Sequence, residues 1–260
     1  MYKNFMIIDS FIFSNELLML DLRLNYLNDV VDKFILVESS VTHSGDPKEL
    51  YFEKNKHRYE KYLHKIEHIV LENLDGPEHS WGESWSRENV HRLGILKGLT
   101  NVPDDALVMV SDVDEIPRKE KVGQIGGYIQ AFLYYYLDVY TGQPWVGTVC
   151  DTAKNMKQNG PQVYRDQRFS NGNVLNAGWH ISFFMTPEEI QTKIKTFAHQ
   201  EYNTPEFTNI DNIERRLHNL RDPFERHDLV PGGVDLTMPD FIFKNEHLFK
   251  DKFRFVSPWN

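Results

Sequence analysis

The stretch that decides the fold is Ala106-Leu107-Val108-Met109-Val110, which runs directly into Ser111-Asp112-Val113-Asp114-Glu115-Ile116-Pro117. A short continuous apolar run is typical of a strand that is buried on both faces of a parallel sheet. Asp112, Asp114 and Glu115 follow it directly, and open α/β sheets bind ligands beyond the carboxyl ends of their strands. The stretch therefore predicts a buried strand that delivers three carboxylates to the rim of a crevice.

The chain before this strand alternates between strand and helix patterns. We expect strands at 5–13, 34–37 and 66–71, and helices at 16–27, 55–64 and 81–99. Apolar residues recur at a helical period in the first helix, at Leu17, Leu20, Leu24 and Leu27. Such alternation predicts an α/β fold with a mostly parallel, twisted sheet flanked by helices.

The second half of the chain has a different pattern. It holds a β-rich aromatic stretch at 128–140, strand candidates at 145–149 and 179–185, a helix at 187–197, and short helices mixed with loops from 205 onward. We find no internal repeat and no low-complexity linker. We therefore expect a single domain over residues 1–260.

Composition excludes several classes of partner and location. The net charge is −9, with Lys and Arg scattered, which argues against nucleic acid or an anionic membrane as the main partner. The lone Cys150 allows no internal disulfide and fits a reducing compartment. The apolar run before Asp9 is too short for a signal peptide, and no stretch reaches ~18 uninterrupted apolar residues. We expect a soluble, cytoplasmic protein with no transmembrane segment.

The acidic cluster itself predicts a divalent metal site. Three carboxylates close together at a strand end repel each other unless a cation neutralises them, and oxygen ligands favour Mg²⁺ or Mn²⁺. On an extended segment Asp112 and Asp114 would point the same way while Val113 packs inward. The alternative is a solvated acidic turn, because Asp-x-Asp is a common tripeptide.

Two enzyme classes use such a cluster. In nucleotide-sugar transfer the metal bridges the two phosphates of the donor. In phosphohydrolases of the haloacid-dehalogenase type the first aspartate, here Asp112, is the nucleophile. That type places its aspartates on the first strand, whereas here they follow about the fourth, which favours sugar transfer. A non-catalytic carbohydrate-binding protein is a third reading.

The chain resembles glycosyltransferase family 17 in several blocks that occur in one order. These are 15–17 with 22–25, 30–34, 37–39 with 42–45, 50–56, 81–89, 111–117, 176–180 and 197–203. The resemblance implies a GT-A-like, half-Rossmann fold in which residues 1–117 bind the nucleotide sugar and residues 118–260 bind the acceptor. It also implies transfer with inversion from a UDP-sugar, with UDP-N-acetylglucosamine as first choice, to a glycan acceptor whose identity stays open.

The resemblance also assigns roles to residues. The general base is expected at Glu201, with Glu188 and Glu189 as alternatives that also fit a helix first turn. Donor contacts are expected from Glu38 and Ser39 to the uridine, from Arg87 and Asn89 to the diphosphate, and from Asp112; Arg87 also fits a surface pair with Glu83. His180 is expected to complete the metal shell of Asp112 and Asp114, with His199, His227 and His247 as alternatives. Trp81, Trp145 and Trp179 are candidates for stacking on sugars, although core packing is expected for at least two of them.

Overall fold

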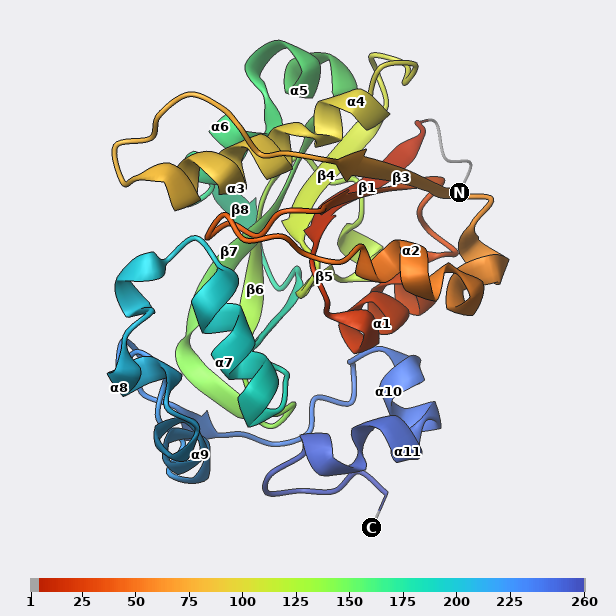
Figure 1. Ribbon diagram of the computed structural model, residues 1–260. Coiled ribbons are helices and arrows are strands. Elements are labelled where there is room, and N and C mark those ends of the chain that lie inside the picture. The colour runs from red at the N-terminus through yellow and green to blue at the C-terminus, as the bar shows by residue number, and fades with distance from the viewer. Residues whose placement is uncertain (1–4, 260) are drawn as a thin grey trace.

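The predicted buried strand lies at the centre of the sheet. In the computed structural model, which describes residues 5–259, β4 (Leu107–Asp112) pairs in parallel with β1 (Ile7–Phe13) and antiparallel with β7 (Val139–Thr152). The ten strands follow the order β3-β2-β1-β4-β7-β6-β9-β5, with β8 beside β6 and β10 beside β7. The expected α/β fold with a mixed, mostly parallel sheet is confirmed (Figure 1).

The parallel part of the sheet comprises β1 to β4, with β2 at Lys33–Ser39 and β3 at Ile66–Leu71. Strand β2 is buried on both faces, because Phe34 and Leu36 enter one apolar cluster while Ile35 and Val37 enter the other. One face is covered by α1 (Leu17–Leu27), α2 (Tyr51–Asn55) and the 3₁₀ helix η1 (Lys56–Tyr62). The other is covered by α3 (Glu83–Leu93), α4 (Ile95–Gly98) and α5 (Ala153–Asn159), as Figure 1 shows.

The second half adds strands of mixed direction to this sheet. Here β7 pairs with β6 (Gly126–Tyr134), β6 pairs in parallel with β9 (Gly178–Ser182), and β5 (Glu115–Pro117) closes the edge. The remaining elements are η2 (Lys119–Lys121), α6 (Pro161–Asp166), β8 (Gly172–Val174), α7 (Pro187–Thr196), η3 (Gln200–Tyr202), α8 (Pro205–Thr208), α9 (Ile210–His218), β10 (Val230–Pro231), α10 (Asp240–Lys244), α11 (Glu246–Phe249) and η4 (Lys250–Lys252).

Three expected elements differ from the expectation in the structure. The helix expected at 81–99 breaks at Gly94 into α3 and α4, where a Cβ on Gly94 would lie 2.7 Å from Val37 Cγ1. The helix expected at 55–64 is a 3₁₀ helix that continues from α2. The aromatic stretch at 128–140 turns between β6 and β7, with Tyr135 at φ 63°. In the part of the chain that the structure describes, none of the helices has both the length and the apolar character needed to cross a membrane.

Candidate functional site

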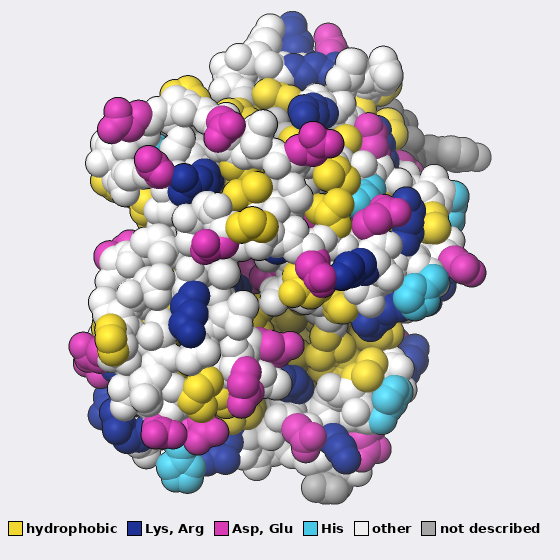
Figure 2. Space-filling view, in the orientation of Figure 1, with side chains coloured by type: hydrophobic (Ala, Val, Ile, Leu, Met, Phe, Trp, Pro, Cys, Tyr) yellow, Lys and Arg dark blue, Asp and Glu magenta, His cyan; other side chains and the backbone are white. Residues whose placement is uncertain are grey.

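A cavity of about 730 Å³ lies where the carboxyl ends of β1 and β4 meet the second half of the chain. Its wall takes residues from the loop after β2, from α3, from β6 and β9, and from α6 and α7. A smaller recess of about 190 Å³ shares Asn15, Glu16, Asp114 and Phe183 with it. The molecule is hollowed over an apolar floor where the start of α1 faces α7 (Figure 2). The cavity therefore lies at the sheet edge predicted from the sequence.

The acidic residues lie in a tight turn between two strands. Asp112 ends β4, Val113 and Asp114 form the turn, and Glu115 begins β5. Arg23 of α1, fully buried, donates from Nη1 to the carbonyls of Asp112, Val113 and Glu115 at 3.1, 3.3 and 2.7 Å. Its other nitrogens bond the Asp9 carboxylate at 2.7 and 2.5 Å. The segment was expected to be extended, but it is a turn whose backbone is held by Arg23. Val113 packs inward, as expected.

Asp112 is bound by two arginines. Its Oδ1 accepts from Arg92 of α3 and its Oδ2 from Arg165 of α6, each at 2.9 Å. Burial opposes ionisation, but Arg165 and Arg92 outweigh it and hold the pKa of the Asp112 carboxyl well below its usual range. Both carboxylate oxygens are therefore engaged by cations of the protein itself.

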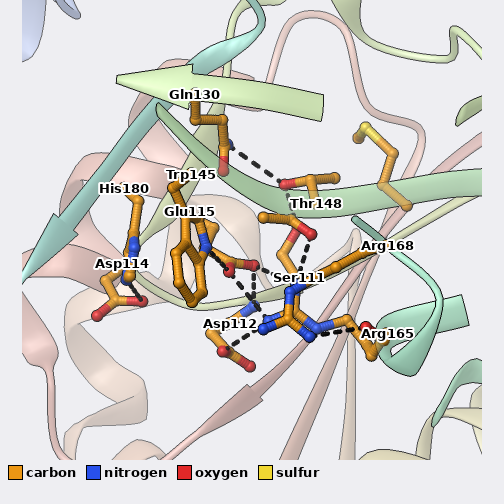
Figure 3. A network of polar contacts seen from close by, with 12 residues as sticks. Ser111, Asp112, Asp114, Glu115, Gln130, Trp145, Thr148, Arg165, Arg168 and His180 are labelled. Carbon is orange, nitrogen blue, oxygen red and sulfur yellow. Dashed lines mark hydrogen bonds and ion pairs between the residues drawn. The ribbon is translucent and has the colours of Figure 1, made fainter. Parts of the chain in front are cut away.

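Glu115 is a structural carboxylate. It is fully buried and accepts from Trp145 Nε1 at 2.7 Å, from Arg165 at 2.8 and 3.0 Å, and from the Asp112 amide at 2.8 Å. In Figure 3 the Glu115 and Asp112 carboxylates both lie beside Arg165. Glu115 therefore fixes Arg165, which in turn fixes Asp112.

Asp114 faces a separate set of partners. Its Oδ1 lies 3.5 Å from His180 Nε2 in β9, and its Oδ2 lies 3.6 Å from Lys193 Nζ in α7. Burial raises the pKa of this carboxyl, but His180 and Lys193 together lower it below the ordinary value. The His180 ring stacks on Phe132 with centroids 4.6 Å apart, which fixes its orientation toward Asp114 (Figure 3).

Arg165 and Arg168 were not found from the sequence. Arg168 lies over the rings of Trp145 and Phe169 at 5.1 and 4.5 Å, and it lines the cavity together with Arg165. Burial and the neighbouring Arg165 lower the pKa of Arg168 to about 10. The one local signal for this segment is Gly160-Pro161, since Pro is favoured at the first position of a helix.

The residues expected to hold a divalent ion are Asp112, Asp114 and His180, and this role stays a prediction. Among residues 5–259, no three His, Cys, Asp or Glu side chains come together in a way that would hold a metal ion. Asp114 and His180 nevertheless present an oxygen and a nitrogen 3.5 Å apart. A ligand pair of this kind suits Mn²⁺ or Mg²⁺ when a bound phosphate and water complete the shell. The expected role of Asp112 as a metal ligand stays a prediction.

The two residues predicted to contact the uridine, Glu38 and Ser39, lie next to the cavity wall, whereas the predicted donor residue Asp112 lines the cavity. Glu38 is fully buried, accepts from the Phe52 amide at 3.0 Å and lies 3.1 Å from His68 Nε2, while Ser39 accepts from the Val41 amide at 3.1 Å. The residues of this segment that line the cavity are Val41, Thr42 and His43. The donor roles of Glu38 and Ser39 stay predictions.

In helix α3 the predicted donor residues, Arg87 and Asn89, also lie outside the cavity lining. Arg87 pairs with Glu83 at 2.7 Å and donates to the His43 carbonyl at 3.3 Å. The residues of α3 that line the cavity are Trp85, Glu88, His91 and Arg92, which share one helical face, and neither Arg87 nor Asn89 is among them. The surface pair of Arg87 with Glu83 is confirmed, and its diphosphate contact stays a prediction.

The predicted base and its alternatives lie in α7 and just after it. Glu201, in η3, is exposed and bonds His199 Nδ1 at 2.6 Å; it is His199 that lines the cavity. Glu189 forms a capping box with Thr186 at the start of α7, and Glu188 lies in the same first turn. Glu16, Glu88 and Asp166 are further carboxylates of the cavity wall.

The remaining histidine and tryptophan candidates differ in burial and in whether they line the cavity. His227 lines the cavity beside Phe132, whereas His247 is exposed in α11 outside the cavity lining. Trp179 is fully buried and donates to Asp235, and Trp145 is bonded to Glu115. Trp81 is 70% exposed at the cavity wall. Core packing is thus confirmed for Trp179, and Trp81 has the free face that stacking on a sugar needs.

Comparison with known proteins connects this geometry to a family. The profile of glycosyltransferase family 17 matches residues 2–232. Beta-1,4-mannosyl-glycoprotein 4-beta-N-acetylglucosaminyltransferase of Rattus norvegicus is 26% identical over 287 residues, which cover 95% of this chain and 52% of the relative. The protein of the same name from Homo sapiens is 26% identical over 70% of this chain and 41% of its own length. The chain thus spans about half the length of the curated relatives it matches. With the family profile matched over most of its length, the chain belongs to glycosyltransferase family 17.

Proposed function

We propose that this chain is an inverting, metal-assisted glycosyltransferase that takes a sugar from a UDP-sugar donor, with UDP-N-acetylglucosamine as first choice, and transfers it to a glycan. The observation that carries the proposal is the set of charged groups around Asp112 and Asp114, which opens onto a cavity of about 730 Å³. Family membership and the N-acetylglucosaminyltransferase relatives support it.

The cations of the cavity suit a diphosphate leaving group. Arg92, Arg165 and Arg168 line it beside Asp112, and Arg guanidinium groups bind phosphate oxygens in a bidentate manner. Asp114 and His180 would hold Mn²⁺ or Mg²⁺, which when bound supplies further charge to the departing diphosphate. Because two arginines occupy both oxygens of Asp112, attack by this carboxylate as a phosphohydrolase nucleophile is disfavoured.

Inversion needs a group that removes the proton of the attacking acceptor hydroxyl. We assign this role to Glu201 acting with His199, which are joined by a bond of 2.6 Å at Nδ1. Because His199 lines the cavity, its Nε2 would take the proton while Glu201 stabilises the charged ring. Trp81 and Trp85 lie on the same wall, with centroids 5.0 Å apart, and would stack on the acceptor sugars.

The decisive experiment measures donor binding and turnover together. We expect UDP-N-acetylglucosamine to raise the melting temperature only when Mn²⁺ or Mg²⁺ is present, and UDP to be released when a glycan acceptor is added. Asp114→Ala should abolish metal-dependent donor binding. Glu201→Gln should keep donor binding and lower kcat by about 10²- to 10⁴-fold.

Three outcomes would contradict the proposal or a part of it. If no nucleotide sugar shifts the melting temperature, the activity itself is wrong. If binding is the same after removal of divalent ions, the Asp114 and His180 site is not a metal site. If Glu201→Gln turns over at the wild-type rate, Glu201 has no part in removing the proton, and Glu16→Gln and Asp166→Asn become the next variants to measure.

A further inference from the structure

The loop after β2 carries a histidine to the cavity wall. His43 lines the cavity, and its ring lies edge-on to that of His91 in α3, with centroids 5.4 Å apart. The loop is closed by its own bonds, since the Thr42 amide donates to the Asp46 carbonyl at 2.8 Å. Arg87 holds it from outside through the His43 carbonyl. The His43 ring is therefore fixed in position rather than mobile.

The neighbours of the two rings determine where their protons lie. His91 Nε2 is 3.0 Å from the Val37 carbonyl oxygen, which can only accept, so Nε2 carries the proton. In a neutral His91 ring, Nδ1 is then an acceptor. His43 Nε2 lies 3.2 Å from that atom and must donate to it. This leaves His43 Nδ1 as the atom with a free lone pair.

Both rings are held neutral. Burial lowers the pKa of His43, with Glu88 opposing, and burial and His43 lower the pKa of His91 well below its usual value. None of the hydrogen bonds found within residues 5–259 involves His43 Nδ1. His43, which lines the cavity, therefore carries a hydrogen-bond acceptor of fixed tautomer at Nδ1.

The position of this acceptor suits the base of a nucleotide. The cations that suit a diphosphate gather around Asp112 at the end of β4, while His43 follows β2. Since β1 lies between β2 and β4, the ends of β2 and β4 are separated by two strand spacings, or about 10 Å. A nucleoside diphosphate bound along the strand ends spans a comparable distance from its phosphates to its base.

From this placement we infer that His43 Nδ1 reads the edge of the donor's nucleobase. It would accept from a base that presents a ring N–H, as uracil does at N3, and reject one that presents a ring lone pair there, as cytosine does. His91 is the positioning residue that sets the tautomer of His43. The inference rests on the proposed function and adds to it the group that selects uridine over cytidine nucleotides.

The test compares the dissociation constants of UDP and CDP by calorimetry in Mn²⁺. We expect wild-type protein to prefer UDP by about tenfold, the effect of one well-formed hydrogen bond against a repelled lone pair. In His43→Gln the amide reaches the place of Nε2, so the bond to His91 remains and the acceptor at Nδ1 is lost; UDP should weaken until the two nucleotides bind alike.

A second variant gives an opposite signature. His43→Asn places an amide at the position of Nδ1 that can accept or donate, so UDP binding should persist while CDP binding strengthens about tenfold. The matched control is His218→Gln, an exposed histidine at the end of α9, which should leave both constants unchanged.

The possible failures are distinguishable. If wild-type protein binds neither nucleotide, the proposed function fails. Two results would overturn the role of His43 while leaving the proposed nucleotide-sugar donor intact. One is equal binding of both nucleotides by wild-type protein. The other is a wild-type ratio of the UDP and CDP dissociation constants in folded His43→Gln and His43→Asn.

Discussion

The two halves of the sheet bring opposite charges to the cavity. The parallel half supplies the carboxylates of Asp112 and Asp114, whereas α6 and α7 of the second half supply the cations Arg165 and Lys193. Arg92 is the cation of the first half that joins them. The acidic cluster is therefore balanced within the protein, and the balance exists only when both halves are in place.

The largest effect is expected from removing Arg165. Arg165→Met leaves the fully buried Glu115 without its cation and Asp112 with Arg92 alone, which should lower the free energy of unfolding by about 3–5 kcal/mol. Denaturant unfolding at neutral pH measures this. The comparison is Arg92→Met, which removes one cation from Asp112 and the bonds to Glu88 and Gln162 but leaves the Glu115 pair intact, so it should cost clearly less. Equal losses would show that the fully buried Glu115 pair carries no special weight.

Acid should gradually weaken the ion pairs that Asp112 and Asp114 form with the second half of the chain. The pKa values of Asp112 and Asp114 are both lowered in the folded protein, so each carboxylate stabilises the fold above its ordinary pKa and loses that effect as the pH falls below about 4. Asp112→Asn should be less stable than wild type at pH 7 and should lose less on acidification. Denaturant titrations from pH 7 to pH 3 check the sign; parallel pH profiles for both proteins would contradict it.

A smaller effect should follow from loosening the helix that carries Lys193. Thr186 caps α7 by accepting from the Glu189 amide at 3.3 Å, and Glu189 returns a bond to the Thr186 amide at 2.8 Å. Thr186→Ala should cost about 1 kcal/mol in unfolding free energy. Thr152→Ala, at the N-cap of α5 away from the cavity lining, should cost a similar amount, but only Thr186→Ala should also weaken metal-dependent UDP binding.

The parallel half could be predicted from sequence because its signals are local. The strand at 107–112 begins with a continuous apolar run, and α1 repeats leucine at a helical period, so burial and periodicity alone place them. Helices α5 and α6 were missed because seven and six residues are too few to establish a period. Arg165 was missed with them, since its role arises from contacts across 50 and 53 residues of chain.

The offset between the predicted donor residues and the cavity lining has a simple geometric cause. Strand β2 continues to Ser39, so the chain reaches the cavity only at Val41, two residues later than expected. Helix α3 is polar on several faces, so the sequence does not show whether Arg87 or Glu88 turns toward the ligand. Adjacent helical residues differ by about 100° in direction. A shift of one position therefore moves a side chain from the cavity wall to the outer surface of the helix.

The buried Arg23 has a consequence for attempts to transplant this site. It donates to three carbonyls of the acidic turn and is itself held by Asp9, so the turn, the first helix and the first strand form one unit although they are distant in sequence. Grafting residues 111–117 alone onto another scaffold would transfer the carboxylates without the Arg23 guanidinium that holds the backbone of the turn. The transferable module is therefore the turn together with Arg23 and Asp9.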